Sequence, residues 1–422
     1  MTPAASSCGL VLAGAAALGA YEAGVLHHIF DGVARDTGRT NLFEVISGTS
    51  AGAINAAAIA SFAEQPALGA ERLCAAWSAL RLGQVLRPSA VELLRSTIEM
   101  TDVSSRLARA MRVRRARGGL LDPQPIAQLL TNMLPIDRID EHLRSGLLRG
   151  VAISATHVAT GRAAVFFQAA GPVPPWEADG AIAIPARLTI QHAMASAAIP
   201  LLLPPVTIDG DLYCDGGLRQ MVPLSPSIHL GARRLLVINP LAPPGGAADE
   251  QARREASTSP FYLAGKALNA LFADRTEVDL ARLEQLTAVL RAGRRRYGAT
   301  FEREINAELV RDRVAPLSEV TALRIAPSRD LGRFAAEYVS GPEIARRERG
   351  IVARLMRRLA EVGATRSGDL LSYVLFDGGF ASEVIALGRA DARARHAELC
   401  EFFAATDRSL TIADQGANRA RS

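Results

Sequence analysis

The chain of 422 residues is long enough to bury a large hydrophobic core and, by the usual size of domains, to divide into two or three parts. Hydrophobic residues make up 49% of it and the formal net charge is +5, which is typical of a folded globular protein and excludes a disordered one. No basic run carries the interleaved aromatic residues of a nucleic-acid site, so we expect no nucleic-acid partner.

The cysteines are far apart in the sequence and form neither a C-x-x-C pair nor a zinc-binding spacing with histidine. They are Cys8, Cys74, Cys214 and Cys400. We therefore expect free thiols in a reducing compartment, and neither a metal nor a cofactor. The apolar residues 10–20 lack the basic flank of a signal peptide and are too few to span a bilayer. These features favour a cytoplasmic protein that touches membranes only peripherally.

The first apolar run, residues 9–13, predicts a buried parallel strand. It leads into a turn of small residues from Gly14 to Gly19, and a helix is predicted over 20–26. A strand, a small-residue turn and a helix start together form an anion-binding nest. A dinucleotide-binding turn is the alternative interpretation, but the G-x-G-x-x-G spacing is absent.

Residues 43–59 predict a short strand, a Gly-Thr-Ser-Ala-Gly turn and an Ala-rich helix. In this context G-x-S-x-G is a nucleophile elbow, with Ser50 at its tip. Gly48 and Gly52 lack a Cβ, so strand and helix can approach closely around the serine. The helix N-terminus then favours an oxyanion at the same point. The alternative is a Gly/Ser-rich turn that only joins the two elements.

Further apolar runs alternate with helical segments along the rest of the chain. Strands are predicted over residues 148–154, 163–167, 233–239 and 322–326, and helices over 70–80, 90–115, 189–198, 260–293, 342–363 and 382–406. Continuous apolar strands alternating with helices indicate an α/β fold with one mostly parallel central sheet and helices on both faces. Ser50 is expected at the carboxyl end of the second strand.

Asp209 and Gly210 signal a hairpin whose second strand ends at Asp215, followed by Gly216 and Gly217. A carboxylate just past a strand end, with two glycines that clear away side chains, can meet a hydroxyl on a neighbouring loop. An ordinary Asp-Gly turn is the alternative. The sequence holds a second Asp-Gly-Gly at Asp377, but there the aspartate is expected to cap a helix.

The predicted helix at residues 90–117 ends in a cluster of arginines with interleaved apolar residues. A basic amphipathic helix of this kind can lie on an anionic membrane surface, and peripheral membrane contact is the hypothesis here. A solvated surface helix is the alternative. The oligomeric state cannot be read from the sequence.

The turn at Gly14–Gly19, the elbow at Ser50 and the segment that ends in Asp215-Gly216-Gly217 together make the chain resemble the patatin-like phospholipase family over residues 8–239. The resemblance implies a three-layer α/β/α fold and a Ser-Asp dyad that works without a catalytic histidine. Ser50 would be the nucleophile and Asp215 its base, acting on a lipid acyl ester. Backbone N–H groups would hold the oxyanion, at Gly14, Ala15, Ala16 and Ala51.

One loop departs from the family pattern. Where the family has Gly-Gly-Gly-x-Arg/Lys-Gly, this chain has Gly14-Ala15-Ala16-Ala17-Leu18-Gly19. Alanine also has an N–H, but its Cβ is penalised by about 1–2 kcal/mol where the loop needs a positive φ. The absence of a basic residue at Leu18 removes extra charge stabilisation. A catalytically weak or inactive lipid- or membrane-binding protein is therefore kept as the alternative function.

A serine hydrolase with a Ser-Asp-His triad is a third hypothesis. Only His229 and His396 follow Asp215 in the sequence, and neither is expected in a loop after a strand. For the organisation of the chain we expect a patatin-like domain at residues 8–239 and a linker at 240–259. A mainly helical C-terminal region, residues 260–410, would pack on the core, and a disordered tail would cover 411–422.

Overall fold

The computed structural model describes residues 7–85, 119, 121–173, 181–241, 276–312, 316–341 and 374–404. Within these ranges the strands form one nine-stranded sheet. They are β1 (Ser7–Leu12), β2 (Val45–Thr49), β3 (Gly150–His157), β4 (Ala163–Ala169), β5 (Ala181–Pro185), β6 (Val206–Ile208), β7 (Asp211–Asp215), β8 (Ala232–Ile238) and β9 (Thr321–Ile325).

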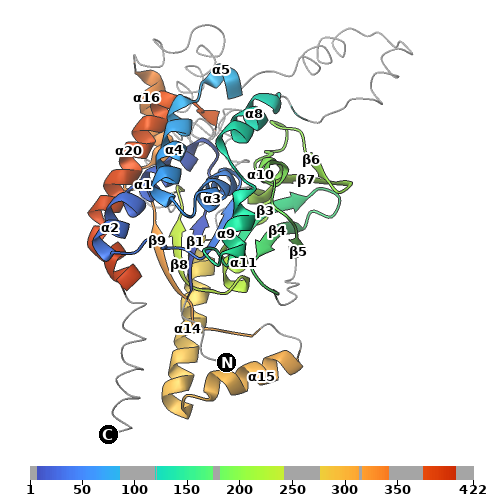
Figure 1. Cartoon of the computed structure of the whole chain (residues 1–422), viewed down its shortest axis with the longest axis vertical. Helices are drawn as coiled ribbons and strands as arrows, with labels where there is room; N and C mark the ends of the chain where they lie inside the picture. The colour runs from blue at the N-terminus through green and yellow to red at the C-terminus, as the bar shows by residue number, and fades with distance from the viewer. Residues whose placement is uncertain are drawn as a thin grey trace, which may run out of the picture.

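The helices come from every part of the described chain (Figure 1). They are α1 (Gly19–His28), α2 (Ala34–Thr37), α3 (Ala51–Ser61), α4 (Pro66–Ala79), α5 (Leu82–Val85), α8 (Gln124–Met133), α9 (Arg138–Arg144), α10 (Ile190–Ser196), α11 (Leu224–His229), α14 (Thr276–Tyr297), α15 (Phe301–Arg311), α16 (Leu331–Ser340) and α20 (Gly378–Ala394). Short 3₁₀ turns are η1 (Ala16–Leu18) and η3 (Gly216–Leu218), and η2 (Ile29–Val33) is a π-helix.

The centre of the sheet is parallel, as the sequence predicts. Strands β3, β2, β1, β8 and β9 lie side by side in that order and run in one direction. On one side β4 pairs antiparallel with β3, and β5 pairs parallel with β4. The hairpin expected at Asp209-Gly210 is present as β6 and β7, and both turn residues have positive φ (50° and 92°).

Two hydrophobic cores lie on opposite faces of the sheet, because alternate residues of each strand point to opposite sides. In β1, Leu10 and Leu12 belong to one core and Val11 to the other, and all three are fully buried. Helices α1, α3, α4 and α20 cover the first face, and α11 packs on the second. This is the three-layer α/β/α architecture, and the continuous apolar runs of the strands follow from burial on both faces.

Helix α20 packs along α1, although the two are far apart in the sequence (Figure 1). Gly24 and Gly388 allow the approach: a Cβ on Gly24 would lie 2.1 Å from the Ile385 carbonyl oxygen, and one on Gly388 2.3 Å from that of Tyr21. The Tyr21 hydroxyl donates to Asp391 Oδ2 at 2.9 Å. Among the described residues, the region after residue 260 therefore contributes both a helix to this layer and strand β9 to the sheet.

Several expectations fall outside the described residues: the basic helix at 90–117, the helix at 342–363 and the tail at 411–422, together with most of the linker at 240–259. The proposed division of the chain stays a prediction. In the described part of the chain, no helix combines the length and apolar character needed to cross a bilayer.

Candidate active site

Ser50 lies at the sharp turn between β2 and α3, at the carboxyl end of the second strand. Its backbone has φ 55° and ψ −124°, a left-handed conformation that non-glycine residues rarely adopt. The crossing of strand and helix beside it is very close, since a Cβ on Gly48 would lie 2.2 Å from the Gly52 carbonyl oxygen. A Cβ on Gly52 would lie 2.5 Å from the Ala13 carbonyl oxygen. Both glycines of the motif are therefore required by packing.

The register of β3 brings Asp215 to Ser50. Strand β2 ends at Thr49, which pairs with Ser154, and the next residue of β3, Ala155, pairs with Asp215 of β7. Strand β7 thus continues the sheet where β2 stops. The Ser50 hydroxyl donates to Asp215 Oδ2 at 2.6 Å, and the Gly217 N–H donates to Oδ1 at 2.7 Å.

The environment of Asp215 suits a proton acceptor. Only 1% of Asp215 and 5% of Ser50 is exposed to solvent. Burial raises the pKa of Asp215 to about 7, against the opposing effects of its hydrogen bonds from Ser50 and Gly217. A carboxyl group with a pKa near neutrality is a stronger base than an ordinary aspartate and is still largely ionised at slightly alkaline pH.

The loop expected to hold the oxyanion lies next to this pair, and Ala16, Ser50 and Ala51 line one cavity. The Gly14 N–H donates to the Met221 carbonyl at 2.9 Å, so an oxyanion would have to compete with that bond. The candidate donors therefore narrow to Ala15, Ala16 and Ala51. Ala16 has φ 46°. At a positive φ an alanine is strained relative to a glycine, so the substitution of alanine for glycine in this loop carries an energetic penalty at position 16.

This strain leads to a prediction for Ala16→Gly. We expect the variant to be less destabilised than Ala17→Gly by about 1–2 kcal/mol, because glycine relieves the left-handed strain only at position 16. The two alanines are matched, since both are buried in the same turn and Ala17 is not among the residues with positive φ. Urea unfolding at pH 8 measures the difference. Equal losses in both variants would contradict the assignment of strain to Ala16.

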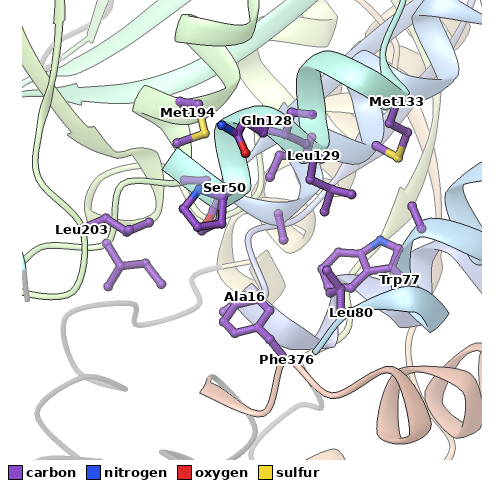
Figure 2. A pocket seen from close by; sticks show the side chains of 18 of the residues that line it. Ala16, Ser50, Trp77, Leu80, Gln128, Leu129, Met133, Met194, Leu203 and Phe376 are labelled. Carbon is purple, nitrogen blue, oxygen red and sulfur yellow. The ribbon is translucent and has the colours of Figure 1, made fainter. Parts of the chain in front are cut away.

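An apolar cavity of about 390 Å³ opens beside Ser50. Figure 2 shows Ser50 near Met194, Gln128 and Leu203, with Trp77 and Leu80 further along the cavity. Apart from Ser50, Gln128 and the indole of Trp77, the described lining consists of aliphatic, methionine, phenylalanine and proline side chains. Phe376, just before α20, also lines it. The chemistry of this lining fits a hydrocarbon chain attached to the group that Ser50 would attack.

A buried polar network that sequence reasoning missed lies behind the loop. The Trp77 indole N–H donates to Asn55 Oδ1 at 3.0 Å, and Asn55 Nδ2 donates to the Gly19 carbonyl at 2.9 Å and to Glu22 Oε2 at 2.7 Å. Burial raises the pKa of Glu22 well above its usual range, against the opposing effect of its hydrogen bond from Asn55. The network connects the cavity wall to the end of the loop. The network is visible only in the folded structure, because it joins residues of α1, α3 and α4.

The other predicted candidates lie elsewhere. Asp377 is the N-cap of α20, as expected, and its Oδ1 accepts from the Gly379 and Phe380 N–H groups and from the Tyr338 hydroxyl. His229 contacts Ser225, and His396 contacts His28 and Asp36. No histidine belongs to the described lining of the cavity. In the ranges that the structure describes, no group of three or more His, Cys, Asp or Glu side chains is placed to hold a metal ion.

Comparison with known proteins gives a family match. The family model described as patatin-like phospholipase matches residues 10–228, about half of the chain. Among solved structures, VipD from Legionella pneumophila shows 15% sequence identity and a TM-score of 0.27, with 63% of this chain and 55% of that chain covered. The chain thus spans little more than half the length of that structure. A search of curated protein sequences finds no match.

Proposed function

The chain belongs to the patatin-like phospholipase family, and from this premise we propose that it is a serine acyl hydrolase that cleaves fatty-acyl esters of lipids. Members of the family are in general carboxylic ester hydrolases. The observation that carries the proposal is the 2.6 Å hydrogen bond to a buried Asp215 from the hydroxyl of Ser50, which lines an apolar cavity.

In the proposed mechanism Asp215 accepts the Ser50 proton while Ser50 Oγ attacks the ester carbonyl carbon. The N–H groups of Ala15, Ala16 and Ala51 would stabilise the oxyanion, assisted by the N-terminus of α3. The alcohol leaves with the proton from Asp215, and the acyl group stays on Ser50. Asp215 then deprotonates water, which attacks the acyl-enzyme and releases the fatty acid. The acyl chain would lie in the apolar cavity.

A non-catalytic protein that binds acyl chains is the second candidate, favoured by the strained Ala16 and by Leu18 in place of a basic residue. Labelling with a fluorophosphonate probe separates the two. We expect labelling of the wild-type protein and none of Ser50→Ala, with Ser61→Ala labelled normally as the matched control for a buried serine. Hydrolysis of phospholipid, lysophospholipid, acylglycerol and p-nitrophenyl esters then gives the substrate class. A folded wild-type protein that neither labels nor hydrolyses any of them would contradict the hydrolase proposal.

The rate of hydrolysis should depend on pH through Asp215. The base must be ionised, and burial raises the pKa of Asp215 to about 7. We therefore expect kcat/KM to reach a plateau above pH 7 and to fall about tenfold per pH unit below it. A soluble short-chain ester measured from pH 4.5 to 9, with circular dichroism at each pH as a control for folding, tests this. An acid limb near pH 4 would contradict a buried base.

A further inference from the structure

Ser196, the last residue of α10, lies fully buried between the elbow and β3. Its hydroxyl oxygen accepts the backbone N–H of Ser50 at 2.8 Å and donates to the Ser154 carbonyl at 2.6 Å. Both contacts fall at the point where β2 ends and its pairing with β3 stops. Ser196 therefore connects the backbone of the elbow to the neighbouring strand where no ladder bond can do so.

This connection matters because the elbow is strained. Ser50 has φ 55°, and a residue keeps such a conformation only when its surroundings hold it there. Its N–H is buried, so it needs an acceptor, and the Ser196 hydroxyl supplies one. Without that hydroxyl, both this N–H and the Ser154 carbonyl would lose a partner.

The same segment also holds the second member of the pair. The Asp215 N–H donates to the Ala198 carbonyl at 2.9 Å, and the Thr156 hydroxyl donates to the Asp215 carbonyl at 2.8 Å. Residues 196–198 thus hydrogen-bond to the backbones of both Ser50 and Asp215. Thr189 and His192 fix the start of α10 through a reciprocal capping box.

We propose that Ser196 is a positioning residue for the proposed hydrolysis: its hydroxyl holds the Ser50 backbone so that Oγ stays within hydrogen-bonding distance of Asp215. The expected effect on kcat rests on the proposed function. The effect of Ser196 on the backbone of Ser50 can be measured without turnover. Ser196 is absent from the described lining of the cavity, so it acts through Ser50 and not on the acyl chain.

Ser196→Ala is the test, with Ser227→Ala as the matched control. Ser227 is also fully buried and hydrogen-bonded to a serine of β2, Ser47, at 2.7 Å, but it lies on α11 at the opposite face of the sheet. In Ser196→Ala we expect kcat to fall about 10- to 100-fold with KM within twofold, because misplacement of a reacting group costs about this much. The acid limb of the pH–rate profile should move to higher pH. The hydrogen bond from Ser50 lowers the pKa of Asp215, so a weaker bond leaves that pKa higher. Ser227→Ala should keep the wild-type kcat and acid limb.

Hydrogen–deuterium exchange of a peptide that contains Ser50 gives the readout that does not need activity. We expect at least tenfold faster exchange there in Ser196→Ala and no change in Ser227→Ala. Should Ser196→Ala fail to fold, Ser196→Cys keeps the volume with a weaker hydrogen-bonding group and should show the same changes in smaller degree. Unchanged exchange at Ser50 in the folded variants would overturn the proposal. A wild-type protein without turnover would refute the hydrolase function, while the exchange result would still decide the role of Ser196.

Discussion

Asp215→Asn should lower kcat by about 10²–10⁴ while the protein stays folded. The Asp215 carboxylate accepts the Ser50 hydroxyl, and an amide at this place can no longer take up its proton. Asp377→Asn is the matched control, because Asp377 is a buried aspartate of the same Asp-Gly-Gly sequence that caps α20. An asparagine oxygen can still accept the capping N–H groups, so turnover should remain within a few-fold of wild type. Initial rates on one short-chain ester compare the three proteins, and the reverse order would assign the base to Asp377.

Asp215→Asn should not lower the free energy of unfolding. Burial raises the pKa of folded Asp215 to about 7, whereas an aspartate in an unfolded chain titrates near about 3.9. Between these values the native state binds more protons, so its stability falls as pH rises and stays reduced above pH 7. Asparagine removes that penalty. The free energy of unfolding at pH 8, measured with urea, should therefore equal or exceed the wild-type value, as expected where a charged group is kept buried for activity.

Gly24→Ala should destabilise the protein by about 3 kcal/mol or more. The added Cβ would lie 2.1 Å from the Ile385 carbonyl oxygen, and a backbone atom inside a helix cannot move aside as a side chain can. Helix α20 would have to shift away from α1. Gly83→Ala is the control, because a Cβ there meets nothing within 4 Å and alanine favours the helix.

Urea unfolding followed by circular dichroism measures both glycine variants. Gly83→Ala should change the free energy of unfolding by no more than about 1 kcal/mol, in the stabilising direction. A Gly24→Ala protein as stable as Gly83→Ala would mean that α1 and α20 do not pack in the closely apposed manner described.

The strands of the sheet could be predicted because burial on both faces leaves a continuous apolar run in the sequence. The run at 9–13 became β1 and the run at 233–239 became β8, each within two residues at either end. Strand β5 (Ala181–Pro185) was not expected. It lies at the edge of the sheet with four of its five residues only half-buried, and its short sequence carries no clear period.

The Ser50 elbow and Asp215 could be predicted because each lies in a local sequence pattern that indicates its backbone geometry: G-x-S-x-G between a strand and a helix, and Asp-Gly-Gly at the end of a strand. Ser196, Asn55 and Glu22 could not, because their roles depend on partners between 22 and 146 residues away. Small residues in a helix such as α10 normally indicate close packing. Nothing in the sequence of α10 indicates that the Ser196 hydroxyl, unlike the neighbouring side chains, hydrogen-bonds to the backbone of Ser50. Positive φ at Ala16 likewise appears only once the loop is closed against Met221.

The pairing of α1 with α20 has a consequence for biosynthesis. Tyr21 and Asp391 are 370 residues apart, so the face of the first helix stays uncovered while most of the chain is still being made. At about 5–20 residues per second, this interval lasts roughly 20 to 70 s. During that time an apolar helix surface is open to association with other nascent chains, and closing so long a loop is slow. The yield of folded protein should therefore depend on translation speed and on chaperones that shield α1 until α20 emerges.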